Sequence, residues 1–582
     1  MSPPLAEPRA GLKLEITLRE VSGRALDPTL EQRPAARLLL GLPGLLLLLV
    51  LLVPIGWTTV WALDADTPLI GNFLDVVTDH SALAAWRNSL VWVVIALVVI
   101  ALGYGIAVIS RHVHELWRVL LYVLILPFGV SALVSGAVFR IIFDPRPERG
   151  VASALFGEDV VWLGPGLIWV VLASSFAWTW LGFVVVLFRA GLDARPKTGP
   201  GVLGHPGLPS PGPVTYIVLL TVLVAAIRVF DLVLIAAPGS MQDSVDVVGL
   251  HWWRITSRTG ETGAPAALAV LLFVIVGLLS FTLMRRQRRT TPAGAPAPAP
   301  VDVPAAPAEE GGDTPQPPPA RRRWPSWLIG IALTALWLLP VMILLATAFH
   351  DPRAAGSKGW WQLSGLGLGS FAEVSASWLW PAMLGSLFLA GLATALVVAG
   401  AVPLAYLLTW GGLPGWLTRT LTTLLVVLAV APVQMYAGPV GNLFGDSGLA
   451  GARTPLALMH AAAGLPFATL VLRTAFQAAP PDPSGTRRPT LDAIWHGRYL
   501  RALVAVGVLE FVLVWNDFIV GFLISGPQST PLNLLLWGEA RQFGIAAGTV
   551  SAGAVVASVV PVAVLMVTWR KVISGLTGGA TE

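Results

Sequence analysis

The sequence predicts an all-α polytopic membrane protein with about twelve transmembrane helices. Hydrophobic residues make up 55% of the 582-residue chain, and charged residues make up only 12%. A soluble domain needs roughly 25% charged residues to cover its surface, so most of this chain must contact lipid instead of water. Apolar runs of about 20 residues, long enough to cross a bilayer as helices, recur along the whole sequence.

The chain also contains a distant copy of itself. Phe230-Asp231-Leu232-Val233 lies late in a hydrophobic run of the first half, and Asn516-Asp517-Phe518-Ile519 lies at the corresponding place in the second. The same order of hydrophobic blocks surrounds each motif. Two parallel repeats in a membrane protein are typical of a transporter, with a pathway between the repeats.

The hydrophobic runs divide into six predicted spans on each side of a linker. This division predicts an N-terminal tail (1–36), a first six-helix half (37–285), a linker (286–324) and a second six-helix half (325–582). The linker is rich in Ala and Pro and cannot bury a core, so we expect a disordered tether. The twelve predicted spans are 37–62, 88–110, 117–139, 162–188, 213–238, 264–284, 325–349, 382–409, 415–440, 454–478, 500–525 and 546–569.

Arginine placement predicts the orientation. The N-terminal tail is arginine-rich, Arg285-Arg286-Gln287-Arg288-Arg289 closes the sixth span, Arg321-Arg322-Arg323 opens the seventh, and Arg570-Lys571 closes the twelfth. All four groups fall on one side if there are twelve spans, and positive residues concentrate on the cytoplasmic side. We therefore expect a multi-pass protein of a bacterial inner (plasma) membrane with both termini in the cytoplasm.

The sequence offers no site for chemistry of its own. Cysteine is absent, which excludes disulfides and thiolate nucleophiles. His112, His114 and Glu115 are too close together to form a metal site alone. The stretch from Gly191 to Thr198 has phosphate-loop spacing, but Pro196 replaces the final glycine and offers no backbone N–H to a phosphate. We expect no metal, no cofactor and no enzymatic activity, so any ATP would be hydrolysed by another subunit.

Several blocks resemble the membrane permease subunits of binding-protein-dependent ABC sugar importers of the α-glucoside/maltose type. Their order along the chain carries the resemblance, which implies two fused permease subunits that form a carbohydrate translocation pathway by alternating access. The implied partners are a dimer of ABC ATPase subunits on the cytoplasmic side, an extracellular or periplasmic sugar-binding protein and the lipid bilayer, with no nucleic acid. The clearest blocks are Arg87-Asn88-Ser89-Leu90, Arg228-Val229-Phe230-Asp231, Pro432-Val433-Gln434-Met435, Leu465-Pro466 with Leu472-Arg473, and Val514-Trp515-Asn516-Asp517-Phe518.

Both halves depart from the family in the loop between their fourth and fifth spans. In the family this loop carries a Glu-Ala-Ala…Gly core and docks into the ATPase. Residues 191–213 instead contain five prolines beyond Pro196, and each interior proline costs a helix about 3 kcal/mol. The second loop begins with prolines and then places four residues at helical spacing. We predict that this helix contacts the ATPase or lies on anionic headgroups; its residues are Leu491, Ile494, Trp495 and Tyr499.

Polar residues inside the predicted spans are the candidates for the substrate pathway, because a charge in the bilayer costs roughly a few kcal/mol. Arg228 and Asp231 are three residues apart and could pair on one helix face. Arg228 and Glu510 occupy neighbouring depths of equivalent helices and could contact each other or sugar hydroxyls. A packing role is favoured for Asp231 and Asp517. The complete set of candidates is Arg228, Asp231, Gln434, Glu510, Trp515, Asn516 and Asp517, with Trp178, Trp180 and Tyr436 as further aromatic candidates for a sugar ring.

Two other functions remain open on the sequence. The missing coupling motifs are compatible with an uncoupled membrane scaffold or sensor derived from such a permease. An ion-driven carrier would require a titratable residue in the pathway, for which Glu510 is the candidate.

Overall fold

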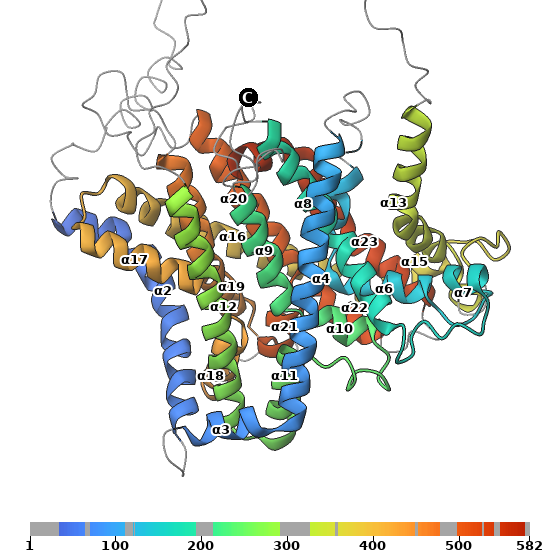
Figure 1. Ribbon diagram of the computed structural model, residues 1–582, viewed down its shortest axis with the longest axis horizontal. Coiled ribbons are helices and arrows are strands. Elements are labelled where there is room, and N and C mark those ends of the chain that lie inside the picture. Colours follow the sequence, from blue (N-terminus) through green and yellow to red (C-terminus); the bar gives the residue numbers. More distant parts are fainter. Residues whose placement is uncertain are drawn as a thin grey trace, which may run out of the picture.

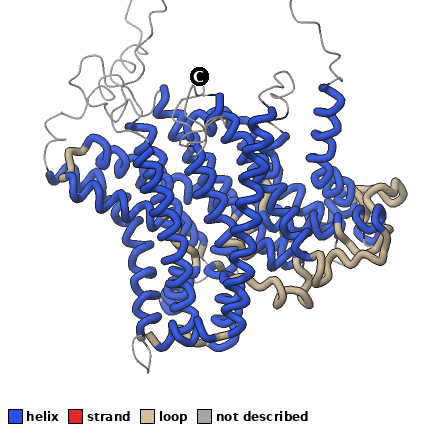
Figure 2. Tube along the Cα trace, viewed as in Figure 1, coloured by secondary structure: helices blue, strands red, loops and turns tan. Residues whose placement is uncertain are grey.

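The computed structural model confirms the helical fold. It describes residues 34–64, 70–110, 120, 123–193, 214–290, 326–355, 359–448, 452–477, 497–526, 529–540 and 547–576. All regular elements of these residues are helices, apart from one isolated antiparallel bridge between His350 and Leu366 (Figure 2). Most of the predicted tail and linker falls outside the described residues.

Long apolar helices form the body of the molecule (Figure 1). Within the described residues, nine helices are long and apolar enough to cross a membrane, and they confirm a polytopic membrane protein. These nine helices are α2 (Pro34–Leu63), α4 (His80–Ser110), α8 (Ile168–Asp193), α12 (Gly263–Thr290), α13 (Ser326–Ala348), α16 (Leu379–Trp410), α19 (Arg453–Gln477), α20 (Gly497–Asn516) and α23 (Ala547–Leu576).

Four of the predicted spans are interrupted, and they are the third and fifth of each half. In the third span of the first half, the 3₁₀ helix η1 (Leu126–Gly129) leads into α6 (Ala132–Ile142), and the two parts of the span are bent by 111°. The other three breaks separate α9 (Val214–Ile227) from α10 (Asp231–Ala236), α17 (Gly415–Leu428) from α18 (Gln434–Asp446), and α20 from α21 (Ile519–Ile524). Broken helices are common where transporters bind their substrates, because the breaks free polar backbone groups.

Short helices complete the described chain outside the long spans. They are α3 (Gly71–Thr78), α7 (Val151–Phe156), α11 (Val248–Thr259), α14 (Pro352–Ala355), α15 (Gly369–Ala376) and α22 (Leu532–Ala540). Equivalent serines fasten two of them. Ser89 Oγ accepts the Val248 N–H at 3.1 Å at the start of α11, and Ser386 Oγ accepts the Leu532 N–H at 2.9 Å at the start of α22. Ser89 and Ser386 both lie in the second span of their half, so these contacts support the internal repeat.

The first span of each half packs against the other half. We refer to residues 34–290 as the first half and 326–576 as the second. Helix α2 lies against α16, α18 and α19, and Thr58 Oγ1 donates to the Met435 carbonyl at 2.8 Å. Helix α13 lies against α6 on the opposite side of the molecule, and Trp178 Nε1 donates to the Trp337 carbonyl at 3.0 Å (Figure 1). This exchange ties the two halves together.

A buried ion pair closes the turn after α6. Arg149 Nη2 lies 3.3 Å from Asp144 Oδ2, and the side chain of Arg149 is only 3% exposed. Arg146 Nε lies 3.5 Å from the other oxygen of Asp144, but its side chain is 52% exposed. Burial lowers the pKa of Arg149, while the Asp144 carboxylate opposes that shift.

We expect Arg149→Met to lower the melting temperature of the purified protein. Removing one partner of a buried ion pair costs about 3–5 kcal/mol, and Arg146 can compensate only in part. Arg146→Met is the matched control, because it removes the exposed partner of the same carboxylate and should cost about 0–1 kcal/mol. Thermal unfolding in detergent measures both variants. Equal losses from the two substitutions would contradict the assignment of Arg149 as the buried partner.

Candidate functional site

The two copies of the internal motif meet where α9 breaks into α10 and α20 breaks into α21. The ring centroids of Phe230 and Phe518 are 6.5 Å apart, and their planes differ by 30°. Phe230 also lies 6.0 Å from Phe522. Phe230 and Phe518 are each 1% exposed. The corresponding helix breaks of the two halves therefore form one junction.

Charged and polar side chains from both halves gather at this junction. Asp517 interacts electrostatically with Arg228 and Asp231, and Arg228 also interacts with Tyr436. His460 Nε2 on α19 lies 3.9 Å from Asp517 Oδ2. We call Arg228, Asp231, Tyr436, His460 and Asp517 the central cluster. It contains one guanidinium, two carboxyl groups, a phenol and an imidazole.

The two carboxyl groups of the central cluster also stabilise the broken helices. Asp517 Oδ2 accepts the N–H groups of Val520 at 3.0 Å and Gly521 at 3.1 Å, so it caps the start of α21. Asp231 Oδ1 accepts the N–H of Leu232 at 3.0 Å at the start of α10. A helix start leaves backbone N–H groups without partners, and these side chains satisfy some of them. This geometry supports the structural role expected for both residues, and Asp517 faces the cluster as well.

The charged members of the central cluster keep partial exposure although helices surround them. The side chain of Asp517 is 17% exposed, and Arg228 and Asp231 are also partly exposed. Tyr436 and His460 are buried. Ionisable side chains in a membrane bundle are tolerated where they pair with each other or face a hydrated space. The interactions within the cluster and its partial exposure meet both of these conditions.

Gln434, on α18, lies beside the same junction and next to Gly249 of α11. It begins α18 and is 4% exposed. A Cβ atom at Gly249 would lie 3.0 Å from Gln434 Nε2 and 3.7 Å from the Val229 carbonyl oxygen. The missing side chain at Gly249 therefore leaves room for the Gln434 amide beside the break between α9 and α10.

Trp515 and Asn516 brace the helices around the junction. Trp515 Nε1 donates to the Ala557 carbonyl at 2.8 Å, which fixes α20 to α23. Asn516 Nδ2 donates to the Gly129 carbonyl at 3.0 Å. That bond joins the broken fifth span of the second half to the broken third span of the first half. Both residues thus hold α20 in register with its neighbours.

Glu510 lies apart from the central cluster. It is 5% exposed, and its carboxyl group occupies the space beside Gly464 on α19, within the second half. Within the described residues the structure forms neither the Arg228–Glu510 contact nor the Arg228–Asp231 ion pair. Helix α9 ends at Ile227, so Arg228 and Asp231 do not share a helix face, and Arg228 instead faces the second half.

The sequence did not predict the aromatic rings beside the cluster. The centroid of Phe522 lies 5.2 Å from Phe518, 5.2 Å from Trp537 and 5.3 Å from Trp253. These rings come from α21, α22 and α11. The spacing of Phe518 and Phe522, four residues apart beside Asp517, was the available signal.

The proposed aromatic candidates of α8 pack within the helix bundle. Trp178 donates to the Trp337 carbonyl, as described above, and Trp180 lies 5.8 Å from Phe128 and 5.9 Å from Phe183. Of the further aromatic candidates, Tyr436 is the one that joins the central cluster.

Only one of the four predicted ATPase contacts, Tyr499, is among the described residues. The other three lie outside them: Leu491, Ile494 and Trp495. Tyr499 lies in the first turn of α20, and its ring centroid is 5.6 Å from that of Phe476 and 6.1 Å from that of Trp410. Tyr499 therefore packs against other rings of the second half.

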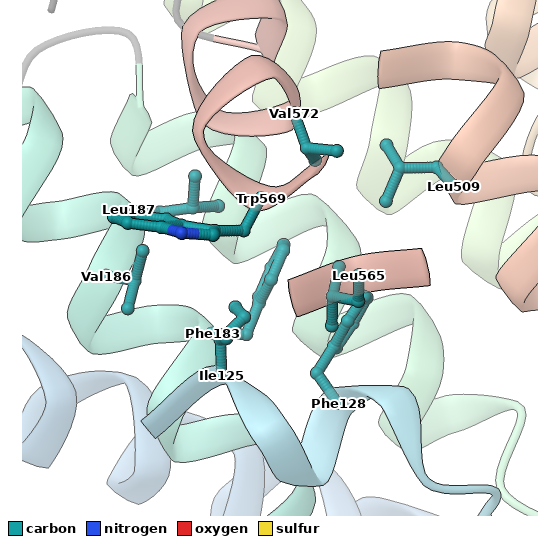
Figure 3. Close-up of a pocket in the computed structure, with 9 residues that line it drawn as sticks. All are labelled: Ile125, Phe128, Phe183, Val186, Leu187, Leu509, Leu565, Trp569 and Val572. Carbon is teal, nitrogen blue, oxygen red and sulfur yellow. The ribbon is translucent and has the colours of Figure 1, made fainter. Parts of the chain in front are cut away.

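A small apolar cavity with a volume of about 20 Å³ lies between the two halves. In Figure 3, Trp569 of α23 reaches across the cavity toward Leu187 of α8. Sugar sites need convergent polar groups, so this apolar space does not suit a sugar. Its lining residues are Ile125, Phe128, Phe183, Val186 and Leu187 from the first half, and Leu509, Leu565, Trp569 and Val572 from the second.

The helices and the central cluster define a polytopic membrane protein whose halves meet at a polar junction, and the known proteins that resemble this chain are membrane permeases. No family model matches the chain. It is 26% identical to the osmoprotective compounds uptake permease protein GgtD of Synechocystis sp., over 43% of this chain and 90% of that protein.

Other relatives have the same class of function. Identity is 25% to the trehalose/maltose transport system permease protein MalF of Thermococcus litoralis, over 38% of this chain and 79% of that protein. Identity is 28% to the alpha-glucoside transport system permease protein AglG of Rhizobium meliloti, over 37% of this chain and 60% of that protein. These three relatives are permease proteins of uptake or transport systems, two of them for named sugars. Each matches less than half of this chain, as expected for two permeases in one polypeptide.

Proposed function

We propose that this chain forms the translocation pathway of an ABC-type carbohydrate importer, with its halves acting as two permease subunits. The observation that carries this proposal is the central cluster, where equivalent helix breaks from both halves meet. The proposed units are 37–285 and 325–582, joined by a cytoplasmic linker. Alternating access would open and close the junction between them.

The chemistry of the junction suits an α-glucoside or another oligosaccharide. A sugar presents hydroxyl groups at its edges and apolar C–H groups on its ring faces. The carboxyl groups of Asp231 and Asp517 can accept from hydroxyls, Arg228 can donate, and the amide of Gln434 can do both. The rings of Phe522 and Trp537 lie near enough to offer apolar faces.

The proposed assembly places the chain in a bacterial plasma membrane with both termini in the cytoplasm. Two ABC ATPase subunits would bind on the cytoplasmic side and hydrolyse ATP, and a sugar-binding protein would deliver the substrate from outside. The chain itself would carry out no catalysis.

Co-purification with candidate sugar-importer ATPase subunits tests the proposal. The complex is placed in nanodiscs, and ATP hydrolysis is measured with binding protein and sugar present or omitted. A stable complex whose hydrolysis rises only with both supports the importer. Failure of every candidate ATPase to bind would contradict it and would favour the uncoupled scaffold.

Glu510 tests the alternative of an ion-driven carrier. Because Glu510 packs beside Gly464 inside the second half, we expect Glu510→Gln to leave uptake within about twofold and its pH dependence unchanged. Glu510→Val, which copies Val224 at the equivalent position, should behave alike. Uptake into proteoliposomes across a pH series measures both variants. Uptake driven by a proton gradient without ATP, and lost in Glu510→Gln, would instead establish the carrier.

A further inference from the structure

Three aromatic rings tie the ends of three helices of the second half. Trp410 ends α16, Phe476 is the second-last residue of α19, and Tyr499 lies in the first turn of α20. Phe476 stacks on Trp410 at 5.0 Å and meets Tyr499 edge-on at 5.6 Å. Trp410 and Tyr499 also meet edge-on, at 6.1 Å. We call Trp410, Phe476 and Tyr499 the aromatic clamp.

The clamp is part of the packed interior. Phe476 is 1% exposed, and Tyr406, one turn earlier on α16, is 3% exposed and lies 5.3 Å from Trp410. Stacked and edge-to-face arrangements at these distances are the favoured geometries of aromatic pairs. Close-packed side chains transmit displacement because they leave little free volume.

The clamp holds both ends of one connection between spans. Phe476 comes just before residues 478–496, which lie outside the described residues, and Tyr499 comes just after them. Because the rings of Phe476 and Tyr499 touch, a displacement at this point moves α16, α19 and α20 together. From Tyr499, α20 runs without a break to Asn516, about 26 Å at 1.5 Å per residue. Asp517 of the central cluster is the next residue, so the clamp is rigidly connected to the pathway.

The first half has a different arrangement in its described part. Matching Leu181-Gly182-Phe183 with Leu465-Pro466-Phe467 places Leu192 opposite Phe476. Its aromatic pair, Tyr104 and Phe188 at 5.6 Å, involves a residue one turn before Leu192. Matching Asp231 with Asp517 places Pro213 opposite Tyr499. The residue types that build the clamp are therefore absent from these positions of the first half.

We propose that the aromatic clamp transmits movement from the ATPase to the central cluster, and that this transmission runs through the second half alone. This inference rests on the proposed importer function, because it requires an ATPase partner. Trp410, Phe476 and Tyr499 act as positioning residues that contact no substrate. The proline-rich sequence of residues 191–213 agrees with a first half that follows passively.

Phe476→Leu tests the clamp, because it removes the ring and introduces the residue found at the matching position 192. The full chain, in complex with its ATPase subunits and binding protein, is reconstituted, and sugar uptake and ATP hydrolysis are measured together. We expect complex formation and ATP hydrolysis to persist, while ATP hydrolysed per sugar rises about tenfold, within the 5–150-fold range of allosteric couplings. Phe476→Tyr, which keeps the ring, should restore the ratio.

Phe188→Leu is the matched control, because it removes a buried ring from the equivalent helix of the first half. It should leave the ratio of hydrolysis to uptake unchanged. Tyr499→Leu, at a half-buried position, replaces Phe476→Leu if that variant does not fold. An unchanged ratio in the clamp variants, or an equal rise in Phe188→Leu, would overturn the inference and leave the importer intact. Failure of the unmodified chain to bind any ATPase would instead overturn the proposed function.

Discussion

Replacing Arg228 with glutamine is expected to reduce sugar uptake by about tenfold to a hundredfold, because a hydrogen bond to a charged group is worth about 1.5–3 kcal/mol. Arg228 is the cation that faces Asp517 and Tyr436 across the junction of the two halves. Without it, the carboxyl groups of Asp231 and Asp517 would face each other with no guanidinium to balance them. Arg228→Lys keeps the charge but loses the planar donor group, so we expect partial activity.

A double-mutant cycle separates this interaction from a general loss of folding. Asp517→Asn removes the charge but keeps an oxygen that can still cap α21. Because Arg228→Gln and Asp517→Asn remove opposite charges, we expect the double variant to lose less than the sum of the single losses. Uptake into proteoliposomes and thermal unfolding measure all four proteins, with Arg146→Gln as an exposed control. Additive losses would show that the two residues act independently.

The membrane fold was predictable because lipid imposes a simple rule on composition. Apolar runs must be about 20 residues long to cross the bilayer, and α4, α16 and α19 follow that rule. The helix breaks were harder to predict, because hydropathy stays high across Val229 and Phe230. The carboxyl groups of Asp231 and Asp517 accept backbone N–H groups at two of these breaks, and these bonds depend on local geometry that a hydropathy count does not contain.

Most residues of the candidate site were predicted from the sequence, but the contacts between them were not. Arg228, Asp231 and Asp517 stood out because charges are costly in a membrane. Helical spacing then suggested that Arg228 pairs with Asp231, which failed because the helix ends between them. His460 was missed because a single histidine in an apolar run carries no pattern, and its proximity to Asp517 arises only when α19 packs against α20.

Tyr499 shows the same limit at the other end of α20. Its spacing with Leu491, Ile494 and Trp495 indicated a helix face that could meet a partner. In the structure its ring turns toward Trp410 and Phe476, which are distant in sequence. Periodicity identifies residues that share a face, but the surface that covers the face depends on tertiary packing.

Replacing Gly44 with leucine is expected to prevent the docking of α2 against the second half. A Cβ atom at Gly44 would lie 2.8 Å from the Gly400 carbonyl oxygen and 3.1 Å from Leu404 Cβ. Backbone and Cβ atoms cannot move aside as the end of a long side chain can, so α2 would have to separate from α16. Small residues permit this kind of close helix contact in membranes. We expect Gly44→Leu to give aggregated protein in size-exclusion chromatography.

Gly56→Leu provides a matched control on the same helix, because a Cβ there meets nothing within 4 Å. It changes helix propensity and size identically and should leave a monodisperse protein whose melting temperature does not fall. Gly44→Ala should fall between them, since overpacking costs about 1–3 kcal/mol and better helix propensity returns about 1 kcal/mol. Monodisperse, stable Gly44→Leu protein would contradict the close approach of α2 and α16. Because that contact joins the first span of one half to the second span of the other, its loss would also show that the halves are stable only together.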